Sequence, residues 1–127
     1  FSLSRVYWYE KKYEKILDVI RHVEYEDFGY NLISKSTLLK AYYELNEYDA
    51  LLSFLETFNV YLNRHKEIPA SKKEPYKVLI NYTKRIIKIN PNEKKTILTK
   101  MKKEIENTTD LPSKSWLLEK LDELAKK

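Results

Sequence analysis

Four polar side chains in the second half of the chain have the types and the spacing of an anion-binding site. They follow one another at i, i+4, i+7 and i+11, so a helix would place them along one face: Lys77, Asn81, Lys84 and Lys88. Lysine and asparagine donate hydrogen bonds without bringing a competing negative charge, which suits a carboxylate ligand. The alternative is that the four residues are only the solvated face that every amphipathic helix must have.

Two groups of titratable residues between positions 18 and 27 could hold a metal ion. His22 has Asp18 four residues before it, which is helical ligand spacing, but both can equally be solvated or capping residues. Glu24, Glu26 and Asp27 could bind a hard cation, or they could place acids near a helix start, where the helix dipole favours them. No cysteine and no His–x₃–His pair completes a zinc set, so we expect no metal site.

The composition excludes several kinds of active site. Gly29 is the only glycine, so there is no glycine-rich phosphate cradle, and no serine nucleophile elbow is present. The absence of cysteine removes thiolate chemistry and disulfides. We therefore expect no catalytic residue and no cofactor in a protein that is not an enzyme. No apolar run approaches the roughly 18 residues that span a bilayer, and no signal peptide is visible, so we expect a cytoplasmic protein with no membrane partner.

The same composition indicates an all-α fold. One glycine and four prolines among 127 residues leave few turn residues for a β fold, while the abundant leucine, lysine and glutamate favour helices. The length predicts a single domain over residues 1–127. The chain begins at Phe1 rather than at a methionine, from which we expect it to be a fragment of a longer protein.

An internal repeat predicts how the helices are arranged. Segment 10–20 aligns without a gap with segment 45–55, which places Tyr13 over Tyr48 at an offset of 35 residues. A period near 34 residues is typical of helix–turn–helix repeats. The sequence LNEY at 45–48 is then the tight turn between two antiparallel helices.

Apolar stripes and capping residues predict seven helical segments. Ser71 followed by Glu74 has the spacing of a capping box, and Asn90 followed by Pro91 is a favourable helix start. The polar stretch SKST at 34–37 could hold a kink. The expected elements are a partial helix at 1–9 and helices near 12–24, 28–45, 47–64, 72–89, 91–106 and 112–125.

Five residues around the turn at 45–48 have the spacing of helix-packing positions: Leu38, Tyr42, Leu45, Tyr48 and Leu52. At these residues the chain resembles the tetratricopeptide repeat family, in which such positions pack the two helices of a repeat. The chain departs from the family pattern where small residues are expected, because Leu39 and Leu51 stand there, and no proline closes the repeat. The resemblance covers about half of the chain. The ending SKSWLLEKLDEL is similar to the final segment of large, uncharacterised bacterial helical-repeat proteins.

The resemblance implies a right-handed α-solenoid of about three antiparallel helix pairs with a C-terminal capping helix. First helices line the groove of such an array. One groove for a peptide carboxylate would therefore combine the four residues at 77–88 with three residues of the preceding repeat: Ser36, Lys40 and Tyr43. The family also implies a non-enzymatic protein–protein interaction or scaffold module of a larger bacterial protein, with an acidic protein or peptide as its partner.

The two ends of the array are expected to differ. No earlier helix covers the apolar residues at the start, so we expect an exposed patch that the rest of the full-length chain or a second copy would cover: Phe1, Leu3, Val6, Tyr7 and Tyr9. The helix at 112–125 carries many charges around its leucines and should be a solvated cap. Leu52 and Leu98 lie in the middle of their apolar stripes and should be buried.

The uneven charge leaves an alternative function open. Residues 1–64 carry a net charge of −2, and residues 65–127 carry +7. The alternative is a nucleic-acid-binding helical domain whose basic half contacts phosphates through Lys94, Lys95, Lys100, Lys102 and Lys103. Arg85 is the only arginine in that half, and arginine dominates specific base contacts, so nucleic acid is the less favoured partner.

Overall fold

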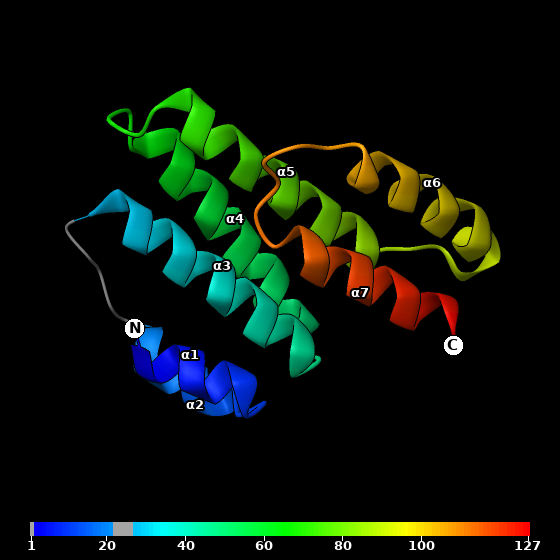
Figure 1. The fold of residues 1–127 in the computed structure, drawn as a ribbon, viewed down its shortest axis with the longest axis horizontal. Helices are drawn as coiled ribbons and strands as arrows, with labels where there is room; N and C mark the ends of the chain where they lie inside the picture. The colour runs from blue at the N-terminus through cyan, green and yellow to red at the C-terminus, as the bar shows by residue number, and fades with distance from the viewer. Residues whose placement is uncertain (1, 22–26) are drawn as a thin grey trace. The chain divides into compact units, whose positions relative to one another are not determined.

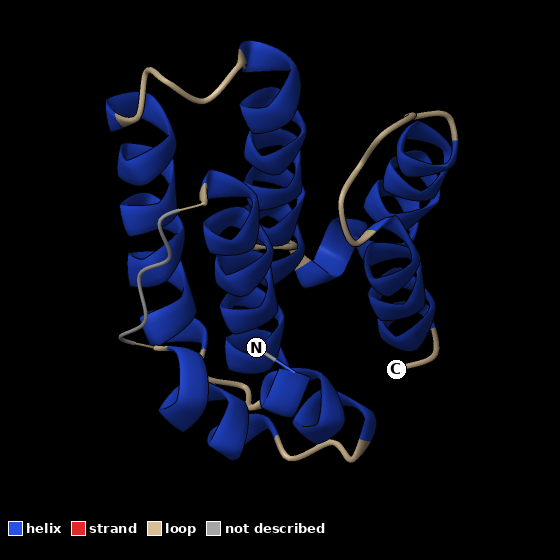
Figure 2. Cartoon of the chain, turned by 60° about the vertical axis from the view of Figure 1, so that its left-hand side comes forward, coloured by secondary structure: helices blue, strands red, loops and turns tan. Residues whose placement is uncertain are grey.

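Helices form the fold throughout the described part of the chain. The computed structural model describes residues 2–21 and 27–127, and within these ranges it has seven α-helices, one short 3-10 helix and no strand (Figure 1 and Figure 2). The all-α class predicted from the composition is confirmed. The contacts divide the chain into two compact units, Phe1–Ile68 and Pro69–Lys127, which we call unit 1 and unit 2.

Unit 1 consists of consecutive helices that each pack against the next. They are α1 (Ser2–Tyr9), α2 (Tyr13–Ile20), α3 (Phe28–Glu44) and α4 (Tyr48–Arg64). The contacts join α1 to α2, α2 to α3 and α3 to α4. Two neighbours therefore cover α3, and even its polar residues Asn31, Ser34 and Ser36 are buried.

An apolar cluster between α2 and α3 holds the first three helices together. Ile16, Leu17 and Ile20 of α2 meet Leu38 and Ala41 of α3 in this cluster. Two aromatic side chains of α1, at positions 7 and 8, pack against the same cluster. An eight-residue helix is unstable by itself in water, so this aromatic packing is what stabilises α1.

The turn after α1 is closed by a residue in the left-handed region. Lys11 has a φ of 59°. Its amide donates to the carbonyl of Trp8 at 3.1 Å, and the amide of Lys12 donates to the carbonyl of Tyr7 at 2.8 Å. This pair of bonds is the Schellman motif, which satisfies the last carbonyls of a helix.

The turn after α3 has the same geometry, 35 residues later in the chain. Asn46 also has a φ of 59°. The amides of Asn46 and Glu47 donate to the carbonyls of Tyr43 and Tyr42, each at 3.0 Å. The hydroxyl of Tyr48 donates to the side-chain oxygen of Asn46 at 2.9 Å. The sequence LNEY is therefore a tight turn between two helices, as predicted.

Unit 2 contains α5 (Ala70–Ile87), the 3-10 helix η1 (Pro91–Glu93), α6 (Lys94–Glu106) and α7 (Lys114–Ala125). Contacts join α6 to α7 and to η1. Each of the three α-helices contributes buried apolar side chains: Leu79, Ile80, Ile86, Leu98, Met101, Ile105, Trp116, Leu117 and Leu121.

The start of α5 differs from the prediction. The helix begins at Ala70, and its N-cap is Pro69, whose carbonyl accepts from the amides of residues 72 and 73 at 2.9 and 3.1 Å. No side chain caps this end, so the predicted capping box of Ser71 and Glu74 is wrong. The physical reason is that Pro69, at φ −59° and ψ 145°, already directs the chain into the helix.

The other helix ends follow the sequence closely. Asn90 accepts from the amide of Asn92 at 3.0 Å, which confirms the predicted cap. At the far end of α6, the Nζ atom of Lys114 donates to the carbonyls of Glu106 and Thr108 at 3.1 and 2.9 Å. Such a lysine satisfies carbonyls that the helix itself leaves without partners.

The structure bears on two predicted details of the first half, a kink at 34–37 and the end of the helix at 12–24. The stretch 34–37 does not interrupt α3. The hydroxyls of Ser36 and Thr37 donate to the carbonyl of Ile33 at 2.8 and 2.9 Å, so they have partners within the helix. The helix predicted at 12–24 corresponds to α2, which ends at Ile20. The last predicted residues, 22–24, lie outside the described residues. The single domain over 1–127 and the right-handed stacking of helix pairs stay predictions.

The N-terminal helix exposes apolar side chains, as expected. Leu3, Val6 and Tyr9 are 49%, 49% and 80% exposed. Tyr7 was expected in the same patch, but it packs against the cluster between α2 and α3. Phe1 lies outside the described residues.

We predict that Lys11→Gly stabilises the protein by about 0.5–1 kcal/mol. A residue with a side chain loses about 1–2 kcal/mol of stability in the left-handed conformation, and glycine avoids this strain. Glycine also has more conformational freedom in the unfolded chain, which cancels part of the stabilisation. Urea denaturation measures the change. Lys15→Gly, inside α2, is the control and should destabilise the protein instead. A loss of stability in Lys11→Gly would show that this turn is not left-handed in solution.

We predict that Leu51→Ala destabilises the protein by about 2–5 kcal/mol, and Leu52→Ala by clearly less. Leu51 is 0% exposed, whereas Leu52 is only partly buried, so the expectation that Leu52 is buried is wrong. Leu98, at 5% exposed, was predicted correctly and should behave like Leu51. Equal losses at positions 51 and 52 in chemical denaturation would contradict the orientation of α4.

Candidate functional site

A pocket in unit 1 lies between α1 and α3. Its volume is about 380 Å³, within the range of small-ligand sites. α1 contributes polar and aromatic residues, and α3 contributes an aliphatic side chain, a hydroxyl and an amine. The lining residues are Ser4, Arg5, Trp8, Tyr9, Ile33, Thr37 and Lys40.

Lys40 is the residue of this pocket with the most unusual surroundings. Its Nζ atom lies 5.0 Å from the centre of the Trp8 ring, in cation–π geometry. Trp8 is held in turn by an edge-to-face contact with Tyr13, with ring centres 5.2 Å apart. Burial lowers the pKa of Lys40, because a desolvated ammonium loses hydration that the neutral amine does not need.

The described contacts of Lys40 include no carboxylate. Elsewhere, Lys12 pairs with Glu10 at 2.7 Å, and Lys77 lies 3.7 Å from Glu74. The lining of this pocket contains two basic residues, Arg5 and Lys40, and no acidic one. Such a place favours an anion from outside the chain.

Of the three groove residues predicted in α3, only Lys40 lines the pocket. Ser36 is buried, and its hydroxyl donates to the carbonyl of Ile33. Tyr43 is also buried, and its ring lies 5.6 Å from that of Tyr48 in an edge-to-face contact. Arg5 and Trp8 were not predicted as site residues, because nothing local in the sequence places α1 beside α3.

The predicted ladder lies along α5 in unit 2. Asn81 and Lys88 are exposed, while Lys77 and Lys84 are partly buried. Glu74, near Lys77, offsets part of the charge at that end. The other end borders a second pocket of about 300 Å³, lined by Lys84, Arg85, Lys88, Ile89 and Ile97.

Arg85 in this second pocket already has a partner. Its Nη1 atom donates to Glu104 of α6 at 3.5 Å, and its guanidinium lies 5.3 Å from the ring centre of Tyr82. The pKa of Tyr82 is raised, mainly by burial and then by the nearby charge of Glu104. The pair joins α5 to α6, so Arg85 is better explained by structure than by ligand binding.

One face of α6 is a shallow basic surface. It borders a concavity of about 470 Å³ and is lined by Lys95, Thr96, Thr99, Lys100 and Lys103. These lysines belong to the set predicted for phosphate contacts. Of the other two, Lys94 donates to the carbonyl of Lys127 at 3.1 Å, and Lys102 lies 4.0 Å from Asp122.

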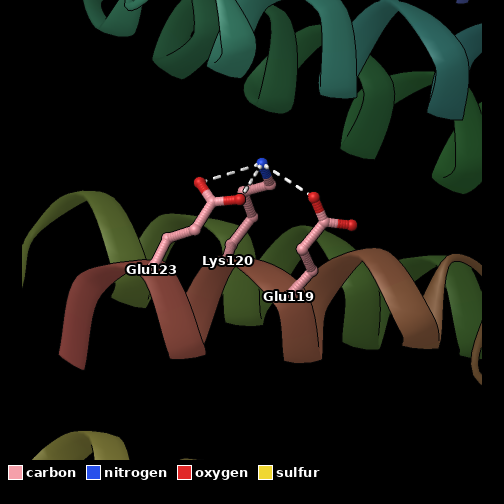
Figure 3. Close-up of polar contacts among 3 residues, drawn as sticks. All are labelled: Glu119, Lys120 and Glu123. Atoms are coloured by element: carbon pink, nitrogen blue, oxygen red, sulfur yellow. Dashed lines mark hydrogen bonds and ion pairs between the residues drawn. The ribbon is translucent and has the colours of Figure 1, made fainter. Parts of the chain in front are cut away.

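Lys120 of α7 is buried at 3% exposed, which corrects the expectation that all charges on this helix are solvated. Figure 3 shows its ammonium between two carboxylates of its own helix. The Nζ atom lies 3.1 and 3.0 Å from the two carboxylate oxygens of Glu123, and 3.7 Å from Glu119. The positive charge of Lys120 is thus fully paired within its own helix and is not free to bind an anionic ligand.

The candidate metal ligands do not gather into a site within the described ranges, where no group of three or more histidine or acidic side chains is close enough to hold an ion. His22, Glu24 and Glu26 lie outside those ranges. Asp27 caps α3, with its carboxylate accepting from the amide of Gly29 at 2.7 Å, which confirms the helix-start interpretation for this residue. His65 pairs with Glu67 at 2.7 Å.

No protein-family model, no curated protein and no solved structure matches this chain. Among the described residues, no helix is long and apolar enough to cross a bilayer.

We predict that Lys40→Met changes stability in a pH-dependent way. The folded state disfavours the charged amine, so the wild-type protein is less stable than the variant at neutral pH and gains stability as pH rises from the lowered pKa toward the ordinary lysine pKa of 10.5. The stability difference in favour of Lys40→Met should therefore shrink over that window. Urea denaturation at a series of pH values measures it, and a difference that stays constant would show that Lys40 is solvated.

Proposed function

We propose that this chain is a non-enzymatic protein-interaction module that binds an acidic segment of a partner protein in the pocket between α1 and α3. The observation that carries the proposal is Lys40, which is partly buried beside Trp8, lines a pocket together with Arg5, and has no carboxylate partner among its described contacts. A carboxylate in this pocket would meet two cationic donors beside an aromatic wall, where low solvent exposure strengthens the attraction.

The chemistry of the pocket narrows the kind of segment. Trp8, Tyr9 and Ile33 offer apolar surface beside the charged groups. A segment with one acidic side chain between aromatic or aliphatic residues fits both features, because it would cover the apolar surface while its carboxylate reaches the ammonium of Lys40.

The proposed architecture is a tetratricopeptide-like, right-handed solenoid. The two matching turns at Lys11 and Asn46 support it, since they share φ, hydrogen-bond pattern and the 35-residue offset of the aligned segments. Helix pairs α1–α2 and α3–α4 would then be successive repeats. In that arrangement the rest of a longer chain, or a second copy, would cover the exposed residues of α1.

The second candidate function is binding of nucleic acid through the basic face of α6. The concavity lined by Lys95, Lys100 and Lys103 favours it, because lysines along one helix face can follow a row of phosphates. The two functions use different residues, so one set of variants separates them.

We predict that short peptides with one glutamate between aromatic or aliphatic residues bind more tightly than the same peptides with glutamine. Lys40→Gln should weaken this binding by about tenfold or more, the effect of losing a charged hydrogen bond. Fluorescence anisotropy on pairs selected from a peptide array measures both. Lys35→Gln is the matched control, since Lys35 lies on the same helix, 4.5 Å from the Tyr61 ring centre, but does not line the pocket.

The outcomes are distinct. Equal binding of the glutamate and glutamine peptides, or equal losses in Lys40→Gln and Lys35→Gln, would refute the pocket as an acidic-peptide site. Salt-dependent binding of single-stranded RNA that falls in Lys100→Gln, but not in Lys40→Gln, would favour the nucleic-acid function instead.

A further inference from the structure

The pocket between α1 and α3 also has the features of a covalent site. We propose that Lys40 is a nucleophilic amine that forms an imine with an aldehyde bearing an aromatic body and an acid group. The inference uses the same pocket as the proposed function, but it does not depend on peptide binding. It rests on the position of one amine inside a cavity rather than on the surface.

The amine of Lys40 is partly desolvated, which favours its neutral form. A lysine attacks carbonyl groups only as the neutral amine, and burial increases the share of that form. Lys40 meets this condition, since burial lowers its pKa, and its amine borders the pocket. No carboxylate among its described contacts holds the proton on it.

The pocket beside Lys40 has room for a small substrate. Many desolvated lysines are enclosed by side chains, but Lys40 borders a cavity of about 380 Å³ that is open to solvent. An aromatic aldehyde of benzaldehyde size fits such a volume. Its ring would lie against the aromatic and aliphatic wall of Trp8, Tyr9 and Ile33.

The basic lining of the pocket favours a substrate that carries an acid group. Arg5 lines the pocket and is exposed, so its donors can bind a carboxylate on the far side of the ligand ring. Thr37 already donates its hydroxyl to the carbonyl of Ile33, so its oxygen remains only as an acceptor. The cationic donor therefore selects an anionic aldehyde over a neutral one.

The reaction needs no further reagent. The neutral Nζ atom attacks the carbonyl carbon, and the carbonyl oxygen takes up a proton to give a carbinolamine. The two amine protons leave with that oxygen as water, and a C=N bond remains. Hydrolysis reverses the reaction, so the adduct is reversible until it is reduced.

The experiment measures labelling rates in the intact chain. 4-Carboxybenzaldehyde is added in limiting amount with sodium cyanoborohydride, which reduces the imine to a stable amine. Peptide mass mapping then compares Lys40 with Lys35 and with the exposed Lys100. We expect Lys40 to be labelled several-fold faster than either, and its rate to reach a plateau at a lower pH than exposed lysines do.

The controls distinguish a more reactive amine at Lys40 from an amine that the reagent merely reaches more easily. In concentrated urea the preference for Lys40 should disappear. Arg5→Gln should reduce the rate at Lys40 with 4-carboxybenzaldehyde but not with benzaldehyde, and circular dichroism shows whether each variant is folded. Lys40→Arg should remove the fast-labelling phase and leave the other sites unchanged. Labelling of Lys40 at or below the rate of Lys100, or a preference that persists in urea, would overturn the proposal.

Discussion

The near-absence of glycine is the constraint on which the described fold depends. A left-handed residue closes a helix most easily when it is glycine, yet every described residue with positive φ carries a side chain: Lys11, Asn46, Asp110 and Ser113. For an ordinary side chain such as that of Lys11 the left-handed conformation costs of the order of 1–2 kcal/mol, which packing and hydrogen bonds must offset. The turns are therefore held by what surrounds them. Asn46 illustrates this, because it accepts a hydrogen bond from the hydroxyl of Tyr48, the first residue of the next helix.

The turn at Lys11 also determines where the pocket lies. By reversing the chain directly after α1, it brings the ring of Trp8 against Tyr13 and against the cluster between α2 and α3. Trp8 then lies next to Lys40 of α3, more than 30 residues away in sequence. The strained turn at Lys11 is thus what places the ring of Trp8 beside the amine of Lys40.

Lys120 and Lys40 are both shielded from solvent, but their ammonium groups have different surroundings. Lys120 is almost completely buried, but two glutamates of its own helix neutralise it. Lys40 is less buried and has an aromatic ring in place of a carboxylate. A buried charge is tolerated when it is paired, so Lys120 is explained within the fold and Lys40 is not. This contrast, more than the number of positive charges, identifies the candidate site.

Most helices could be predicted because their information is local. Apolar stripes, the Asn90 cap and the aligned turn segments act over a few residues, and the helix ends of the structure follow them closely. The buried face of α3 was harder to predict, because α2 and α4 cover two of its sides and no single apolar stripe marks a core face. The family analogy therefore placed Ser36 and Tyr43 in a groove, although both are buried. The pocket itself depends on contact between α1 and α3, which local patterns do not contain.

The desolvation of Lys40 makes its proton part of any binding event in this pocket. A carboxylate entering above the lowered pKa would restore the ammonium, so binding would take up a proton from the buffer and the affinity would fall as pH rises. The measured heat of binding would then include the ionisation heat of the buffer. An aldehyde requires the opposite state, because it reacts only with the amine from which the proton has left. A single proton would thus decide between two classes of ligand, with acids favoured at lower pH and carbonyl compounds at higher pH.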